Sequence, residues 1–196
     1  MSTAKLVIPF YSMTGTNHQM AEIAKAAAEE AGAEVRLRRA EETAPKEVVE
    51  GQEKWKEQLE KMKDIPVITT DDMEWGNAYL FSVPTRYGAV PSQMQAFIDT
   101  LGPLWQKGAL AGKVASAMTS AGTQHGGHET TLLGLYTTFM HWGSVLVAPG
   151  YTGEKSFEHG NPYGASAIAN DVNDVVTSIV QHQAKRVVEI AGKLAG

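Results

Sequence analysis

The sequence predicts an α/β fold built on a doubly wound, five-stranded parallel sheet with strand order 2-1-3-4-5. Two observations predict this class. Apolar strand-like segments alternate with segments of helical periodicity, which is the pattern of βαβ units. The second strand-like segment, Glu34–Arg38, alternates apolar and charged residues as an edge strand does, whereas the other strands are more continuously apolar, as buried parallel strands are.

The expected strands cover residues 5–10, 34–38, 78–83, 114–119 and 144–148. The first of them contains Pro9, which cannot donate to a ladder, so we expect an irregularity near the carboxyl end of this strand. Helical spacing of apolar residues predicts a first helix after the first strand. It also predicts a long last helix over Asp174–Leu194.

Two extra segments exceed a minimal five-strand unit, one after the second strand and one after the fifth. Glu41–Asp64 is highly charged with a thin apolar stripe, so we expect a solvated helix there. Gly150–Ala169 contains glycines and aromatic residues and lies between the last strand and the last helix.

Length and composition bound the class of protein. The 196 residues are expected to form one domain over residues 1–196, and the net charge of −5 argues against a nucleic-acid partner. There is no Cys, which excludes disulfides, thiolate metal sites and thiol catalysis, so redox chemistry would need a bound cofactor. No apolar run reaches the ~20 residues of a membrane helix, and the N-terminus shows no signal peptide, so the cytoplasm is the default compartment.

A hydroxyl-rich turn, Ser12–Asn17, joins the first strand to the first helix. Free backbone N–H groups and the positive end of the helix dipole make such a turn an anion site. The turn contains no Lys or Arg and matches neither the P-loop nor the G-x-G-x-x-G pattern. It is typical of a phosphate held by hydroxyls and amides alone, although an ordinary polar turn with an N-cap would read the same way.

The turns after the third and fourth strands carry similar chemistry. Pro84–Gly88 offers a hydroxyl, a guanidinium and an aromatic ring, and the turn that begins at Thr119 and continues to His128 is rich in Gly and hydroxyls. Because the carboxyl ends of parallel strands meet at one edge of the sheet, these turns should converge with Ser12–Asn17. The convergence predicts a cofactor site rather than plain connecting loops.

Short motifs that are weak singly form a specific combination across nearly the whole chain. They are Ser12-Met13-Thr14-Gly15, Pro84-Thr85-Arg86-Tyr87-Gly88, Leu104-Trp105, His141-Trp142-Gly143 and Pro162-Tyr163-Gly164-Ala165. The combination closely resembles the WrbA family of flavodoxin-like, FMN-dependent NAD(P)H:quinone oxidoreductases. The resemblance implies a flavodoxin-like fold and tightly but non-covalently bound FMN. It also implies ping-pong hydride transfer from NAD(P)H through FMN to quinones, which become hydroquinones.

The resemblance and the turns together give the expected site. FMN contacts are expected from Ser12, Met13, Thr14, Gly15, Thr16, Asn17, Pro84, Thr85, Arg86, Tyr87, Gly88, Thr119, Ser120, Ala121, Gly122, Thr123, Gln124, His125 and His141. The substrate pocket is expected to hold Tyr87, Trp105 and His141, with His141 donating a hydrogen bond to the quinone. In the family the Trp comes from a neighbouring subunit of a tetramer, so a homotetramer is expected.

Other interpretations remain open at this stage. His125 and His128 lie on a Gly-rich loop with Glu129, and no metal site is expected from them. His141 precedes Gly143 at a helix end, where it could be a cap, and Trp105 lies on an expected loop, where it could be a core or an interface residue. The rival function is a flavodoxin-type electron carrier with no quinone reductase activity of its own.

Overall fold

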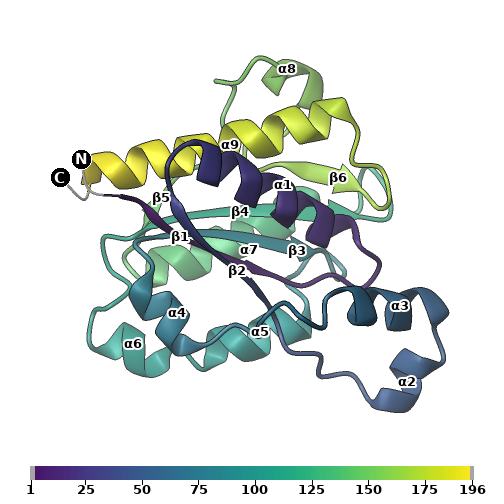
Figure 1. Ribbon diagram of the computed structural model, residues 1–196. Coiled ribbons are helices and arrows are strands. Elements are labelled where there is room, and N and C mark those ends of the chain that lie inside the picture. Colours follow the sequence, from purple (N-terminus) through teal and green to yellow (C-terminus); the bar gives the residue numbers. More distant parts are fainter. Residues whose placement is uncertain (1–2, 195–196) are drawn as a thin grey trace.

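The computed structural model describes residues 3–194 and contains the predicted parallel sheet (Figure 1). Five strands follow the order β2-β1-β3-β4-β5, which confirms the prediction. A sixth strand, β6, pairs in parallel with the carboxyl end of β4. In chain order the strands are β1 (Lys5–Phe10), β2 (Glu34–Arg39), β3 (Ala78–Pro84), β4 (Val114–Ala121), β5 (Val145–Leu146) and β6 (Ser166–Ile168).

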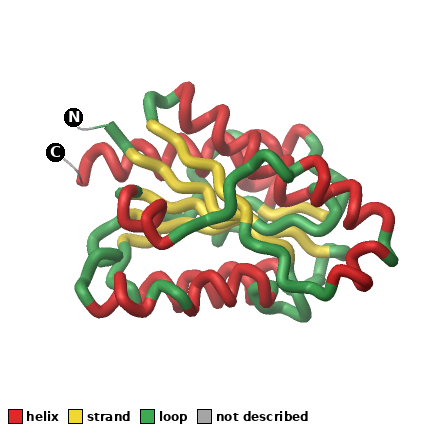
Figure 2. The backbone as a smooth tube through the Cα atoms, turned by 60° about the horizontal axis from the view of Figure 1, so that its bottom comes forward, coloured by secondary structure: helices red, strands yellow, loops and turns green. Residues whose placement is uncertain are grey.

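Helices cover both faces of the sheet (Figures 1 and 2). On one face α1 (Thr16–Glu30) packs against α9 (Asp174–Leu194), whose bounds match the predicted last helix. The other face carries α4 (Thr70–Trp75), α5 (Ser92–Asp99), α6 (Gly102–Gln106) and α7 (His128–His141). The sheet therefore separates two apolar cores, one beneath α1 and α9 and one beneath α5 and α7.

The segment after β2 differs from the single helix expected there. It forms two short helices, α2 (Lys46–Glu50) and α3 (Glu53–Lys61), with Gly51 between them. The apolar positions also divide, because Val48 is 44% exposed whereas Trp55 is only 7% exposed. The pair lies beside the start of α1 and is thus attached to the carboxyl edge of the sheet (Figure 1).

The remaining differences lie in short elements. The strand expected over residues 144–148 shortens to β5, and both of its residues are exposed. Gly150–Ala169 contributes α8 (Ser156–His159) and β6, and Trp105 lies in the one-turn helix α6 rather than in a loop. The expected irregularity in the first strand is present, because β1 pairs with β3 at Leu6, Val7 and Phe10 but not at the two residues between.

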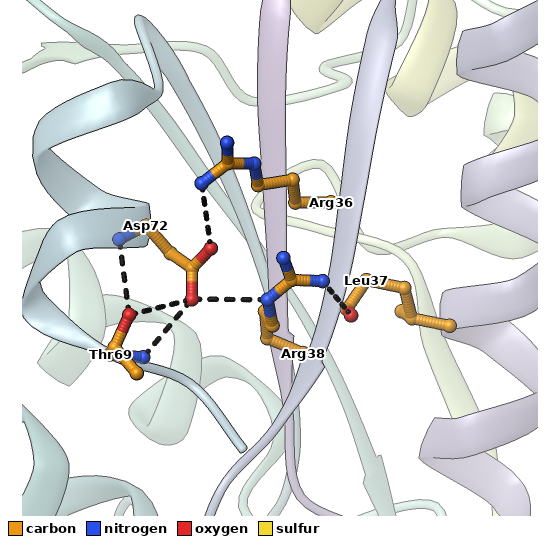
Figure 3. Close-up of polar contacts among 5 residues, drawn as sticks. All are labelled: Arg36, Leu37, Arg38, Thr69 and Asp72. Carbon is orange, nitrogen blue, oxygen red and sulfur yellow. Dashed lines mark hydrogen bonds and ion pairs between the residues drawn. The ribbon is translucent and has the colours of Figure 1, made fainter. Parts of the chain in front are cut away.

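A buried carboxylate fixes α4 to the edge strand β2 (Figure 3). Asp72 accepts hydrogen bonds from Arg36 and Arg38, each at 3.0 Å, and forms a reciprocal capping box with Thr69. Burial alone would raise the pKa of Asp72, but the hydrogen bonds from Arg38, Thr69 and Arg36 outweigh burial and hold the pKa below its ordinary value.

At the other end of α4, Lys113 donates from Nζ to the carbonyl oxygens of Met73 and Glu74 at 2.8 and 2.9 Å. Burial lowers the pKa of Lys113 to about 8. Within residues 3–194, no helix combines the length and apolar character that a membrane span requires.

Candidate functional site

A cavity of about 310 Å³ opens at the carboxyl edge of the sheet, where the turns after β1, β3 and β4 meet. Its wall consists of Ser12, Met13, Thr14, Thr16, Asn17, Pro84, Thr85, Arg86, Ser120, Ala121, Gly122 and Ala169. The structure therefore brings together the three turns whose convergence the sequence predicts. Ala169 is the member that sequence reasoning missed, because nothing in the sequence indicated that β6 joins this edge.

The amino end of α1 faces this cavity. Gly15 precedes the helix with a φ of 105°, a left-handed conformation that favours glycine, and its N–H donates to Ser12 Oγ at 3.1 Å. The first backbone N–H groups of a helix have no partner within it, so the start of this 15-residue helix presents free donors and a positive dipole end. Of the described residues that line the cavity, Arg86 alone carries a positive charge.

Asn17 connects the start of α1 to the carboxyl ends of β3 and β4. Its side chain is 1% exposed, donates from Nδ2 to Ser82 Oγ at 3.2 Å and accepts from Ser120 Oγ at 2.5 Å. Ser82 lies in β3 and donates back to the Asn17 carbonyl oxygen at 3.0 Å, while Ser120 lies in β4. Asn17 therefore fixes the spacing between the start of α1 and the ends of both central strands.

Side-chain hydrogen bonds fix the conformation of the turn after β3. Thr85 Oγ1 accepts from the Gly88 N–H at 3.0 Å and from Thr131 Oγ1 at 2.8 Å. Arg86 donates to the Thr85 carbonyl oxygen and reaches Met13 Sδ at 3.3 Å. Tyr87 has a φ of 54° and its side chain is fully exposed. A non-glycine residue in this conformation is uncommon and strained. The strained backbone of the turn places the aromatic ring of Tyr87 in solvent.

The turns after β3 and β4 touch through two glycines. A Cβ added to Gly127, whose φ is 95°, would lie 2.7 Å from the Gly88 Cα. A Cβ added to Gly88, whose φ is 80°, would instead lie 2.9 Å from the Thr130 hydroxyl oxygen in α7. The contact between the turns favours glycine at residue 127, and the left-handed conformation favours glycine at both positions.

Other predicted residues lie near the cavity without lining it. Thr119 is fully buried in β4, and its hydroxyl finds no hydrogen-bond partner among the described residues. Thr123 is exposed on the loop after β4, while Gln124 and His125 line a neighbouring cavity of about 460 Å³ together with His128 and His159. Within residues 3–194, no group of three or more His, Asp or Glu side chains is placed to hold a metal ion.

Trp105 and His141 lie at the opposite edge of the sheet. Trp105 Nε1 donates to the His141 carbonyl oxygen at 2.9 Å, and the adjacent Gly143 accepts from the Gly112 N–H, just before β4 begins. The cavity lies beyond the other end of β4, roughly 23 Å away at about 3.3 Å per residue. One chain therefore does not bring these two residues to its own cavity.

The carboxylate of Glu42 forms a second polar cluster behind the cavity, which sequence reasoning also missed. It accepts from Tyr11 Oη at 2.9 Å, Trp55 Nε1 at 3.0 Å, Gln93 Nε2 at 2.8 Å and the Ala44 N–H at 2.9 Å. Tyr11 directly precedes Ser12, so the cluster reaches the root of the cavity turn.

Fold and site together define a flavodoxin-like α/β protein with a cavity lined by polar turns at the carboxyl edge of its sheet. The model of the NADPH-dependent FMN reductase family matches residues 11–157. A protein from Deinococcus radiodurans named NAD(P)H dehydrogenase (quinone) is 54% identical over 197 residues, which cover 98% of each chain. A protein of the same name from Geotalea uraniireducens is 41% identical over 97% of this chain and 99% of its own.

This chain therefore belongs to the NADPH-dependent FMN reductase family. Among solved structures, a flavodoxin, WrbA-like protein from Agrobacterium tumefaciens superposes with a TM-score of 0.70 at 18% identity, covering 97% of this chain and 99% of its own. The two-electron reduced flavodoxin of Megasphaera elsdenii superposes with a TM-score of 0.57 at 18% identity, over 92% of this chain and 98% of its own. At this level of identity the superpositions establish the flavodoxin-like fold alone.

Proposed function

We propose that this protein is a WrbA-type NAD(P)H:quinone oxidoreductase that uses FMN. The observation that carries the proposal is the cavity in which three polar turns meet at the start of α1. Its donor set suits one phosphate group: free helix amides and the hydroxyls of Ser12, Thr14 and Thr16, without a lysine. The named relatives and the family support both the cofactor and the reaction.

FMN would be held by residues from all three turns. The turn Ser12–Asn17 would bind the phosphate, Pro84–Gly88 would contact the flavin, and residues 119–125 would reach the pyrimidine end of the ring. When bound, FMN supplies two-electron chemistry, taking a hydride from NAD(P)H and reducing a quinone. This chain's part is to orient the ring, to exclude water from one face, and to offer Arg86 as a positive charge beside it.

The assembly that we propose is a homotetramer in which a second copy completes the substrate pocket with Trp105 and His141. Their position at the far edge of the sheet supports this, because within one chain they cannot serve its own cavity. Exposed apolar side chains on the same part of the surface suit an interface between copies; they include Trp105, Met140, Val145 and Leu146. Tyr87, exposed at the cavity edge, would form the pocket wall opposite them.

Spectra and kinetics test the proposed reaction. Purified protein is expected to show a flavin spectrum, to release FMN rather than FAD, and to oxidise NADH or NADPH with benzoquinone in ping-pong kinetics. The rival electron carrier would bind FMN but show no such turnover. Replacing Thr14 and Thr16 by Val should weaken FMN binding, since each hydrogen bond to a charged phosphate contributes about 1.5–3 kcal/mol. Protein that fails to bind FMN would refute the proposal.

Sedimentation and rapid mixing test the assembly. We expect a tetramer at micromolar concentration. His141→Ala should slow reoxidation by quinone more than reduction by NAD(P)H, because the lost donor faces the charge that develops on the quinone oxygen. A fully active monomer, or unchanged rates in both half-reactions, would contradict the shared pocket.

A further inference from the structure

The Glu42 carboxylate is a half-buried anion whose hydrogen-bonding capacity is filled by neutral donors. Each of its oxygens accepts two hydrogen bonds, Oε2 from Tyr11 and Trp55 and Oε1 from Gln93 and the Ala44 N–H. The donors come from separate parts of the fold, namely the end of β1, α3, α5 and the segment before α2. Within residues 3–194, no Lys, Arg or His forms an ion pair with Glu42.

This cluster is joined to the cavity at two points. Tyr11 is 3% exposed and covalently precedes Ser12, whose hydroxyl accepts from the Gly15 N–H and shapes the turn at the start of α1. Gln93 lies in the first turn of α5, just after the turn that carries Arg86. A substitution at Glu42 would therefore remove one hydrogen bond to Tyr11, at the start of the first cavity turn, and one to Gln93, at the end of the second. These two positions are called the roots of the cavity turns.

The charge of Glu42 also acts on Tyr11, the residue directly before the cavity turn. Burial raises the pKa of the Tyr11 hydroxyl, the Glu42 charge raises it further, and the positive charge of Arg86 acts in the opposite direction. Tyr11 thus stays protonated and remains a donor. Tyr11, which donates to Glu42 at 2.9 Å and directly precedes the cavity residue Ser12, is therefore influenced both by the Glu42 carboxylate and by Arg86, which lines the cavity.

We propose that Glu42 is a positioning residue for the flavin site, which fixes the roots of two cavity turns and, by its uncompensated negative charge, lowers the reduction potential of the bound flavin. The inference rests on the proposed function, since it concerns FMN at this cavity. A positioning role without charge would alter affinity alone. The two parts of the proposal are therefore separated by measuring affinity and potential on the same variants.

The test uses Glu42→Gln, Glu42→Asp and the matched control Glu41→Gln, which makes the same chemical change at the exposed neighbouring residue. An amide has one accepting oxygen and one donating nitrogen. In Glu42→Gln the new NH2 group would therefore face two hydrogen-bond donors where a carboxylate oxygen now accepts from them. Apoprotein is titrated with FMN by flavin fluorescence, and the two-electron midpoint potential is measured by dye equilibration. Circular dichroism and urea unfolding show whether each variant is folded.

We expect Glu42→Gln to bind oxidised FMN about tenfold or more weakly and to shift the potential to a more positive value. Each tenfold gain in the affinity for reduced over oxidised flavin corresponds to about 30 mV. Glu42→Asp, which keeps the charge on a shorter stem, should weaken binding with little shift in potential, and Glu41→Gln should match the wild type in both.

If Glu42→Gln is too unstable to assay, Trp55→Phe replaces it, because this change removes one donor and keeps a ring in place; weaker FMN binding is then expected. Wild-type affinity and potential in folded Glu42→Gln, or wild-type affinity in Trp55→Phe, would overturn the inference. Failure of the wild-type protein itself to bind FMN would instead refute the proposed function.

Discussion

Replacing Asn17 by Ala should destabilise the protein by about 2–6 kcal/mol. The change removes two neutral hydrogen bonds, from Nδ2 to Ser82 and from Ser120 to Oδ1. Each contributes about 0.5–1.5 kcal/mol net. Ser82 keeps its bond to the backbone carbonyl of residue 17, but the Ser120 hydroxyl, 4% exposed, is left without this acceptor. A buried donor without a partner adds about 1–3 kcal/mol.

Urea unfolding of the apoprotein, followed by tryptophan fluorescence, measures the change in the free energy of unfolding. FMN titration of the same variant should show weaker binding, because the lost side chain sets the spacing of all three cavity turns. The matched controls are Ser120→Ala and the double variant Asn17→Ala/Ser120→Ala. Removing both partners leaves no orphaned hydroxyl, so the double variant should lose less than the sum of the single changes. A loss below about 1 kcal/mol for Asn17→Ala, or strictly additive effects, would refute the reasoning.

Three further changes probe other parts of the fold. Gly127→Ala should lower the free energy of unfolding by at least about 2 kcal/mol and weaken FMN binding, because an L residue is strained at left-handed φ and the new Cβ meets the neighbouring turn. The control Gly192→Ala, which lies in open space within α9, should be neutral or slightly stabilising. Asp72→Asn should cost about 3 kcal/mol at pH 7. Because the folded pKa of Asp72 is lowered, the wild type should lose this advantage as pH falls below about 4, and acid unfolding curves of the two proteins should converge. For Lys113, whose pKa is about 8 in the folded protein and about 10.5 when unfolded, the unfolded chain binds the proton more tightly between these values. Wild-type stability should therefore rise with pH across this window relative to Lys113→Met, and parallel pH profiles would contradict the assignment.

The sheet was predictable from the sequence because the spacing of apolar residues in each strand shows whether the strand is buried or at an edge. The alternation of Glu34–Arg38 indicated an edge strand, and the apolar spacing over Asp174–Leu194 gave the last helix with its observed bounds. β6 was not predictable, since three residues are too short to show a period. Glu41–Asp64 was predicted as one helix, but Gly51 ends the first of two.

The cavity turns were predictable for a topological reason, because turns after parallel strands meet at one edge. The same topology also determines where Trp105 and His141 lie. A helix that follows a parallel strand runs back along the sheet, so the end of α7 must reach the edge where β4 begins. The Glu42 cluster could not be found in this way, because its partners Tyr11 and Gln93 are 31 and 51 residues away and a carboxylate in a charged segment gives no signal of its own.

The hydrogen bonds of Asn17 and Glu42 suggest how the proposed phosphate site would work with so little positive charge. Asn17 joins the cavity turns from the face covered by α1, and Glu42 joins them through Tyr11 and Gln93 from the face covered by α5. A lysine could follow a misplaced phosphate, but backbone amides bind only where the backbone already points at the anion. A site made of amides and hydroxyls therefore depends on groups that fix the backbone beforehand. In this protein those groups are Asn17, which lines the cavity, and Glu42, which is not part of its lining, on opposite faces of the sheet.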